Sequence, residues 1–433
     1  MKLWQKIFKP IIIFVNKTNW YGFRLEREWV KTRSLLIYDL ASNMKNIYLL
    51  FSFFFSILSF GQANVGYTSV DAKMTAIPAN ATNSTEAIAK YINANFKTEN
   101  DKIRAVFYWT ASNISYDVAN MYGVNSTETP QDRIIKTLKT KKGICGDYAT
   151  IFNEIANLVG TKSVVVEGYT KQDGKAATLA HAWCAAKIDN KWYLFDPTWG
   201  SGYVNNNKYT RKINNGYFKV APSKMINSHM PFDYLWQFNN YPITNQEFSD
   251  GKIQINKTEK NFDFESEIKK YEALPKIDQL FESAQRIEKN GIKNQLISTA
   301  YTYKKMSWST QRQNENGAKY NAIVKHYNEA INELNDFIYY RNNKFKPFLS
   351  DNEIKSKIEN PIQKLEKCQE SLFRIGFMGS ENAASVSDLK KSIADALIQS
   401  GTHLEFVNNY LSKSKLVRKT MFSKVSWYGV PLN

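Results

Sequence analysis

Cysteine is scarce in this chain of 433 residues: there are three, and no two of them form a CxxC pair. Three cysteines cannot staple a chain of this length, and their odd number leaves at least one thiol free. Without a CxxC pair a structural zinc site is not expected, and the sequence indicates neither a metal nor another cofactor. The composition therefore excludes a disulfide-dense miniprotein, and it excludes a coiled coil and a collagen-like chain as well.

Acidic residues are in the minority, with 40 Asp and Glu against 58 Lys and Arg, for a formal charge of +18. No tight cluster of five basic residues occurs, so a solvated basic surface is favoured over docking on an anionic cell envelope. Nucleic-acid binding is disfavoured because no binding motif is present. Aromatic residues make up 14%, too many for a disordered chain. At ~150 residues per domain, the length favours two or three domains.

One apolar run, Ile47–Phe60, has a composition typical of export signals. It has 14 residues, too few for a comfortable transmembrane helix, which needs ~20. It follows Met44-Lys45-Asn46 and ends in Gly61-Gln62-Ala63, which predicts a secretory signal peptide over residues 44–63. No cysteine follows, so no lipoprotein anchor is expected. The sequence predicts an exported protein, periplasmic or extracellular, without a stable membrane span in its mature chain.

The position of this signal is unusual, because 43 residues precede it. Our hypothesis is that translation begins at Met44 and that residues 1–43 are an upstream extension absent from the native protein. The alternative is an internal signal anchor that leaves residues 1–43 in the cytoplasm. N-terminal sequencing of the native protein distinguishes the two.

The chain after the signal divides into a connecting segment and two larger parts. Residues 64–83 show no apolar period and are interpreted as a linker. A first domain is predicted over residues 84–245 and a helical C-terminal domain over residues 251–433. Because helical periods are followed by strand periods in the first domain, an α+β fold is predicted. Its helices are expected to begin near Ser84, Asp101, Thr129 and Cys145, and its strands are expected at 163–169, 178–188 and 191–196.

The C-terminal part is rich in polar residues at helical periods. Its longest amphipathic stripe runs from Tyr320 to Ile338. Asn360-Pro361 is interpreted as the start of another helix, and a further stripe runs from Val386 to Leu411. This pattern predicts a bundle of about four or more helices, with no repeat and no visible chemistry.

Cys145 is placed at the start of a predicted helix. Unpaired backbone N–H groups and the positive end of the helix dipole stabilise a thiolate there. Gly143 and Gly146 flank it and are expected to leave room for a substrate carbonyl. Asp147 would oppose ionisation if its carboxylate pointed at the sulfur, although a nearby imidazolium should outweigh it. For Cys145 considered alone, a buried structural cysteine is the alternative.

A predicted hairpin supplies the imidazole. If Asp189-Asn190 form a two-residue turn, Ile188 pairs with Lys191. Counting back along both strands places Asp196 diagonally across from His181 on one face, within reach of a hydrogen bond. An aspartate held in this way fixes the tautomer of the imidazole and supports its positive charge.

Two neighbours of His181 on the same strand face in opposite directions. Trp183 shares the face of His181, because strand side chains alternate. Cys184 lies an odd number of residues away and faces the other side, which argues against a metal shared with His181. Packing in the core is the favoured interpretation of Cys184, and also of Cys368 on its helical stripe.

Three blocks, Gly143–Ala149, Ala180–Trp183 and Lys191–Gly200, resemble the transglutaminase-like superfamily. The preceding segment Lys102–Asp117 resembles it as well, and the match covers about residues 84–204. A later segment, His229–Asp233, resembles one that follows the core in exported bacterial members. His229 lining the cleft and His229 packing in a loop both remain open.

The resemblance implies a papain-like α+β core, in which a helix-borne cysteine packs on an antiparallel sheet. It implies Cys145 as nucleophile, His181 as base and Asp196 as orienting residue. The Cys145 backbone N–H is expected to contribute to the oxyanion hole. Weaker candidates for cleft walls or oxyanion support are Gly146, Trp109, Trp183 and Trp199.

We therefore expect an exported cysteine acyl-transfer enzyme that acts on protein or peptide amide bonds through a Cys145 thioester. Hydrolysis is favoured over cross-linking, because water is abundant and no amine-binding cleft is visible in the sequence. The expected partner is a protein or peptide substrate. If the enzyme acts in the cell envelope, this substrate is expected to be envelope-associated. The alternative is a catalytically silent transglutaminase-like scaffold that binds a protein or an envelope polymer.

Overall fold

The computed structural model describes residues 66–123, 128–251, 260–422, 424–425 and 431–432. The predicted upstream extension and signal peptide lie outside these residues. Two compact units are present, divided between Trp308 and Ser309; we name them the core unit, up to Trp308, and the helical unit, from Ser309. None of the described helices is long and apolar enough to span a membrane.

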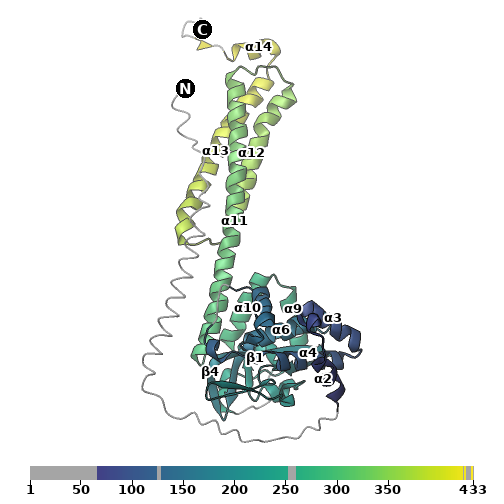
Figure 1. Ribbon diagram of the computed structural model, residues 1–433. Helices are drawn as coiled ribbons and strands as arrows, with labels where there is room; N and C mark the ends of the chain where they lie inside the picture. Colours follow the sequence, from purple (N-terminus) through teal and green to yellow (C-terminus); the bar gives the residue numbers. More distant parts are fainter. Residues whose placement is uncertain (1–65, 124–127, 252–259, 423, 426–430, 433) are drawn as a thin grey trace. The chain divides into compact units, whose positions relative to one another are not determined.

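The core unit combines helices with a four-stranded antiparallel sheet (Figure 1). The sheet has the order β5-β4-β3-β8 and consists of β3 (Ser163–Gln172), β4 (Lys175–Ile188), β5 (Lys191–Phe195) and β8 (His229–Pro231). The helices are α2 (Thr68–Thr75), α3 (Thr85–Asn95), α4 (Glu99–Asn113), α5 (Pro130–Thr140), α6 (Cys145–Leu158), α7 (Pro222–Met225), α8 (Asn245–Asp250), α9 (Phe264–Ala273) and α10 (Lys276–Lys289). Two small pairs complete the unit: β1 (Ser115–Tyr116) with β2 (Lys142–Gly143), and β6 (Gly202–Asn205) with β7 (Lys208–Arg211).

Local capping explains where the first long helices begin. Ser84 Oγ accepts a hydrogen bond from Ala87 N–H at the start of α3. Thr129 forms a capping box with Asp132 at the start of α5. These helices and the start of α6 at Cys145 agree with the sequence prediction, and the predicted α+β fold is confirmed.

The first helix of the unit corrects the interpretation of residues 64–83 as a linker. Its side chains Val70 and Met74 are buried in the main hydrophobic cluster. Its carboxylate Asp71 accepts from Nε of Arg104 on α4 at 2.8 Å. Since no side chain caps the start of α2, the helix depends on these tertiary contacts.

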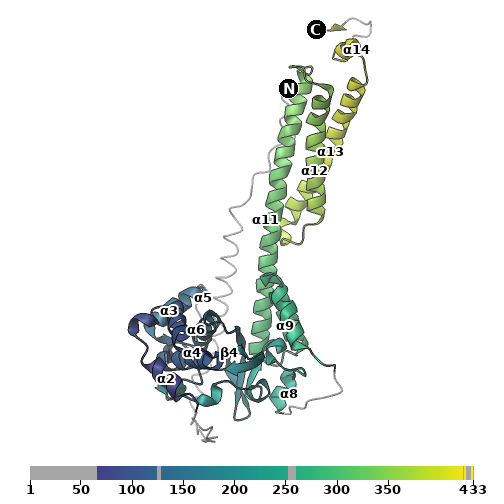
Figure 2. The same ribbon diagram turned by 90° about the vertical axis from the view of Figure 1, so that its right-hand side faces the viewer.

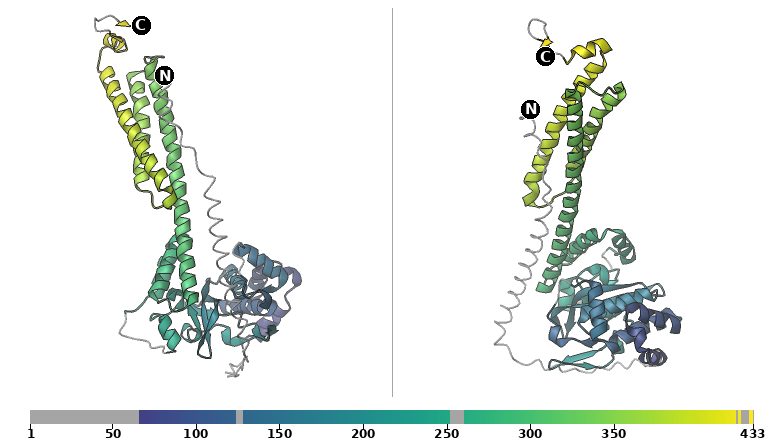
Figure 3. Two further views of the ribbon diagram at one scale, coloured as in Figure 1. Left: turned by 90° about the vertical axis from the view of Figure 1, so that its left-hand side faces the viewer. Right: turned by 45° about the horizontal axis from the view of Figure 1, so that its top comes forward.

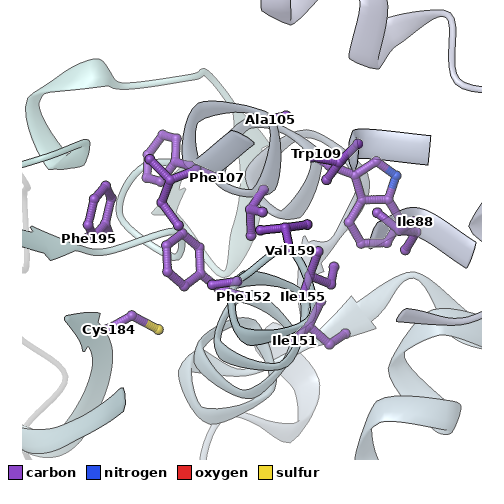
Figure 4. Close-up of a cluster of buried hydrophobic side chains, with 14 of the residues drawn as sticks. Ile88, Ala105, Phe107, Trp109, Ile151, Phe152, Ile155, Val159, Cys184 and Phe195 are labelled. Atoms are coloured by element: carbon purple, nitrogen blue, oxygen red, sulfur yellow. The ribbon is translucent and has the colours of Figure 1, made fainter. Parts of the chain in front are cut away.

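The main hydrophobic cluster fixes helix α6 against its neighbours. In Figure 4, Phe152 of α6 points toward Phe107 of α4, and Phe195 of β5 lies beside them. Cys184 faces this cluster from β4, and its Sγ donates to the Ala149 carbonyl at 3.2 Å. This packing anchors the helix that carries Cys145.

The β4–β5 hairpin has the predicted register. Ile188 is paired with Lys191. Asp189 and Asn190 have φ values of 48° and 60°, as a two-residue turn of this type requires. His181 and Asp196 thus stand at the open end of this hairpin.

Helices α9 and α10 belong to the core unit, so the helical unit begins later than residue 251. Ile268 of α9 packs in one cluster with Trp183. Ile287 of α10 packs in another cluster with Met230 of β8. These contacts join both helices to the sheet that carries His181.

The helical unit consists mainly of three long helices, rather than four or more, within the described residues. They are α11 (Gln295–Asn342), in which the boundary between the units falls, α12 (Asp351–Phe373) and α13 (Ala383–Leu411), with the short elements α14 (Lys415–Thr420), β9 (Lys424–Val425) and β10 (Pro431–Leu432) after them. The three run side by side (Figure 2 and Figure 3) and share one cluster that includes Ile323, Leu365 and Leu389.

The start of α12 corrects the interpretation of Asn360-Pro361. The helix begins nine residues earlier, at Asp351, after a capping box between Ser350 and Glu353. Pro361 lies inside the helix and is buried. The helix therefore continues through a proline, which lacks one backbone N–H donor.

Candidate active site

Cys145 is the first residue of α6, directly after the N-cap Ile144. The N–H groups of this first turn have no partner within the helix. The His181 side chain and the Ala182 backbone N–H lie close enough to the Cys145 thiol to lower its pKa. Burial opposes ionisation of the thiol, but the hydrogen bond and the charge of His181 outweigh it and hold the pKa below its ordinary value.

His181 lies between the thiol and a carboxylate. Its Nε2 is 2.7 Å from Oδ2 of Asp196, which leaves Nδ1 for Cys145. Burial lowers the pKa of His181, but the charge and the hydrogen bond of Asp196, together with those of Cys145, prevail and raise it to about 10. With the pKa of the thiol lowered and that of the imidazole raised, a thiolate beside an imidazolium is favoured over the two neutral groups.

Asp196 follows β5 and is completely buried. Its Oδ1 accepts from the backbone N–H groups of Thr198 at 2.9 Å and Trp199 at 3.0 Å. Its Oδ2 accepts from His181 and also lies 3.1 Å from Nε2 of His229. Burial raises the pKa of Asp196, but the positive charge of His181 and the hydrogen bonds of both imidazoles hold it far below its ordinary value.

Both carboxylate oxygens of Asp147 accept hydrogen bonds within the protein. Its Oδ2 accepts from the Ile144 N–H at 2.8 Å, and its Oδ1 accepts from Arg133 Nε at 2.8 Å. A Cβ at Gly146 would lie 2.8 Å from Nη2 of Arg133, and one at Gly143 would lie 2.7 Å from Cβ of Asp147. Both glycines thus make room for this ion pair, which differs from the expectation that they leave room for a substrate carbonyl.

The tryptophans proposed from the sequence fall into two groups. Trp183 stacks on His181 with ring centroids 6.1 Å apart, and Trp199 lies 5.5 Å from the same imidazole. Trp109 is fully buried and lies beside Ile88 in the main cluster (Figure 4). Trp183 and Trp199 therefore surround the imidazole, whereas Trp109 is a core residue and not part of a cleft wall.

His229 is the residue that sequence reasoning left unassigned. It lies in β8, which pairs with β3 by placing His229 opposite Thr170. Its side chain is buried against the carboxylate of Asp196. The segment His229–Asp233 was the available signal, but local spacing does not reveal that this strand joins the sheet beside β3.

His181, Asp196 and His229 offer three metal-ligating atoms within 4.8 Å of one another. The two nitrogen–oxygen separations, 2.7 and 3.1 Å, are hydrogen-bond lengths to one shared oxygen. Each imidazole directs a hydrogen toward that oxygen, whereas a metal needs a free nitrogen lone pair. Hydrogen bonding therefore accounts for the arrangement of these three side chains.

Residues 86–197 match the family model of the transglutaminase-like superfamily. This part of the chain is a transglutaminase-like domain. It contains Cys145, His181 and Asp196, whereas His229 lies beyond the matched residues. The antiparallel sheet and the helix-borne cysteine belong to this domain and its direct continuation in β8.

Relatives are similar to this chain over a limited stretch. Kyphoscoliosis peptidase of Homo sapiens is 31% identical over 159 residues, which are 35% of this chain and 24% of the relative. Hillarin of Drosophila melanogaster is 23% identical over 171 residues, 35% of this chain and 20% of the relative. The chain thus spans less than a quarter of the length of these relatives. A crystal structure of a TGase aligns at 20% identity and a TM-score of 0.22, covering 44% of this chain and 43% of the other.

Proposed function

We propose that this protein is a cysteine acyl-transfer enzyme that acts on amide bonds of proteins or peptides through Cys145. The observation that carries the proposal is the connected series from the thiol through His181 to Asp196, in which the imidazole lies 2.7 Å from the carboxylate. A thiolate beside an imidazolium is a nucleophile with a proton donor at hand. The family match of the same residues supports the same chemistry.

The reaction begins with attack of the Cys145 thiolate on the carbonyl carbon of an amide. The Cys145 backbone N–H at the helix start is placed to stabilise the oxyanion. His181 transfers its proton to the amine nitrogen, the C–N bond breaks, and a thioester forms as the amine departs. His181, now neutral, takes a proton from water, the hydroxyl attacks the thioester, and the acid leaves while the sulfur is released.

Hydrolysis is the proposed outcome, in preference to transfer to a lysine amine. The relative from Homo sapiens is named as a peptidase, which supports a peptide bond as the scissile bond. Incubation with a peptide library and a fluorescent primary amine measures both outcomes in one sample. New peptide termini support hydrolysis, whereas incorporation of the amine into peptides without cleavage favours cross-linking.

We also propose export through the segment 44–63, with translation beginning at Met44. The apolar run with its small-residue end supports this proposal. N-terminal sequencing of the native protein should find a mature end near residue 64. Recovery of any peptide from residues 1–43 contradicts the start at Met44.

The first experiment measures the alkylation rate of each cysteine against pH by mass spectrometry. Cys145 should react fast well below pH ~7 in the wild type and lose this reactivity in His181→Ala. Cys184 and Cys368 are buried and serve as internal references. A Cys145 that titrates near the ordinary ~8.5 contradicts the proposal and favours the silent scaffold.

A further inference from the structure

His229 is a buried histidine that the proposed mechanism does not use. Its strand, β8, comes 33 residues after Asp196 in sequence, yet it joins the edge of the sheet at Thr170 of β3. The side chain is 0% exposed. Burying the polar atoms of an imidazole is costly unless each of them is bonded, so its partners indicate its role.

The partners of His229 determine which ring nitrogen carries hydrogen. Nε2 lies 3.1 Å from Oδ2 of Asp196, and Nδ1 lies 2.8 Å from Oγ of Ser228. Because an ionised carboxylate only accepts, Nε2 must donate. Burial lowers the pKa of His229 and outweighs the hydrogen bond and charge of Asp196, which raise it, while the positive charge of His181 lowers it further; the neutral ring is therefore favoured. Nδ1 therefore accepts from the Ser228 hydroxyl.

Aromatic rings prevent the imidazole of His229 from turning away. Trp199 and Trp183 meet it edge-on, with centroids 4.7 and 5.1 Å from its own. Tyr217 lies at 6.1 Å; burial raises the pKa of this phenol to about 12, so it stays uncharged in the neutral range. Among the side chains around His229, His181 carries a positive charge, and Asp196 carries a negative charge and accepts the hydrogen bond. The ring is thus locked with Nε2 toward the carboxylate.

We propose that His229 is a positioning residue for Cys145 chemistry, which fixes Asp196 Oδ2 at the point where it meets His181 Nε2. Two backbone N–H groups hold Oδ1 of the same carboxylate, and His229 completes the set on Oδ2. It acts through Asp196 rather than on the sulfur. The inference rests on the proposed function, since a fixed Asp196 matters only where the thiol is activated.

The test compares His229→Phe with His229→Gln in the full chain. Phenylalanine keeps a flat ring among the tryptophans but has no donor, whereas the glutamine amide places an N–H near the position of Nε2. In His229→Phe the alkylation rate of Cys145 at pH 7 should fall about tenfold, with its midpoint moved about one unit toward the ordinary value. His229→Gln should recover most of the rate. A residue that only packs would lower the melting temperature of both variants and leave the midpoint unchanged.

Ser228→Ala is a second variant that keeps the inference testable if His229→Phe does not fold. It removes the hydroxyl that donates to Nδ1 at a partly buried position. The ring is then free to carry its hydrogen on Nδ1, so a smaller rise of the Cys145 midpoint is expected. Wild-type midpoints in every folded variant overturn the role of His229 alone. A wild-type protein whose own Cys145 titrates at ~8.5 overturns the proposed function first, and this inference with it.

Discussion

Arg133 and Asp147 form an ion pair beside the first turn of α6. Nε and Nη2 of Arg133 lie 2.8 and 2.7 Å from Oδ1 of Asp147. The other oxygen caps the helix through the Ile144 N–H. The carboxylate nearest in sequence to Cys145 is therefore neutralised by a cation from α5, and its capacity to oppose a thiolate is reduced.

Replacing Arg133 with glutamine should make the thiol harder to ionise. Asp147 would keep its helix-capping bond but lose its counter-charge, and an unpaired negative charge nearby disfavours a thiolate. We expect the alkylation midpoint of Cys145 to rise by up to about one unit. The pH profile of alkylation, read by mass spectrometry, measures this rise.

Lys136→Gln is the matched control on the same helix. It removes the same formal charge, but Nζ of Lys136 bonds to Glu128 at 2.8 Å and the side chain is 61% exposed. Screening by solvent should leave the Cys145 midpoint where it is. Equal shifts in both variants would mean that overall charge, rather than the Arg133–Asp147 pair, governs the thiol.

The pKa of His181, raised to about 10, predicts an unusual titration among the four histidines. Burial holds the pKa of His229 and of His403 below the ordinary value. Proton NMR of the imidazole C–H signals should show one histidine that loses its charge near pH 10. In Asp196→Asn this titration should move down toward ~6.5, because the negative charge that supports the imidazolium is gone.

The raised pKa of His181 also predicts how the stability of the protein changes with pH. A histidine whose pKa is higher when folded than the unfolded 6.5 binds its proton more tightly in the native state. Its contribution is fully present below pH ~6.5 and is lost as the pH rises through about 10. Unfolding by urea in Cys145→Ala, where the thiol no longer titrates, should show this loss at a pH below about 10, because Cys145 contributes to the raised pKa of His181. The loss should be absent in Cys145→Ala/His181→Gln.

The site was predictable where one local rule fixes the geometry. The Asp189-Asn190 turn determines the register of β4 and β5, and the structure has the expected bond between His181 and Asp196. His229 was not predictable in the same way, because its place depends on β8 pairing with β3. Sequence spacing carries no information about that non-local strand pair.

The fold was predictable where caps and periods are strong. The linker interpretation of 64–83 failed because α2 has no capping side chain and relies on the Asp71–Arg104 pair. The start of α12 was misplaced because Pro361 was weighted above the capping box at Ser350. A tertiary contact therefore determines α2, and a helix cap determines the start of α12.

Arg286 should be essential for the stability of the core unit. Its Nε lies 2.7 Å from Oδ1 of Asp233, and the two side chains are 11% and 3% exposed. Arg286→Met leaves a buried carboxylate without its cation, which costs about 3 kcal/mol or more. Denaturant unfolding measures this loss. Lys270→Met, whose pair with Glu267 is 69% exposed on the lysine side, should leave the stability nearly unchanged.

The end of the core unit can be tested with two fragments that both begin at residue 64. One ends at residue 250, directly before the start of the C-terminal domain predicted from the sequence, and the other ends at Trp308. The shorter fragment lacks α9 and α10. It therefore lacks Arg286, which pairs with Asp233, and the Gly291 carbonyl, which accepts from Asn245 Nδ2 at 2.7 Å.

We expect the fragment that ends at Trp308 to unfold cooperatively and the shorter one to lack a cooperative transition, as followed by circular dichroism. Loss of α9 and α10 uncovers the apolar side chains against which Ile268 and Ile287 pack, and about 25 cal/mol is lost for each Å² of apolar surface exposed. Those side chains include Trp183, which stacks on His181, so the shorter fragment should also lose the fast alkylation of Cys145. If the shorter fragment unfolds cooperatively and keeps a reactive Cys145, then α9 and α10 are not needed for the stability of the transglutaminase-like domain.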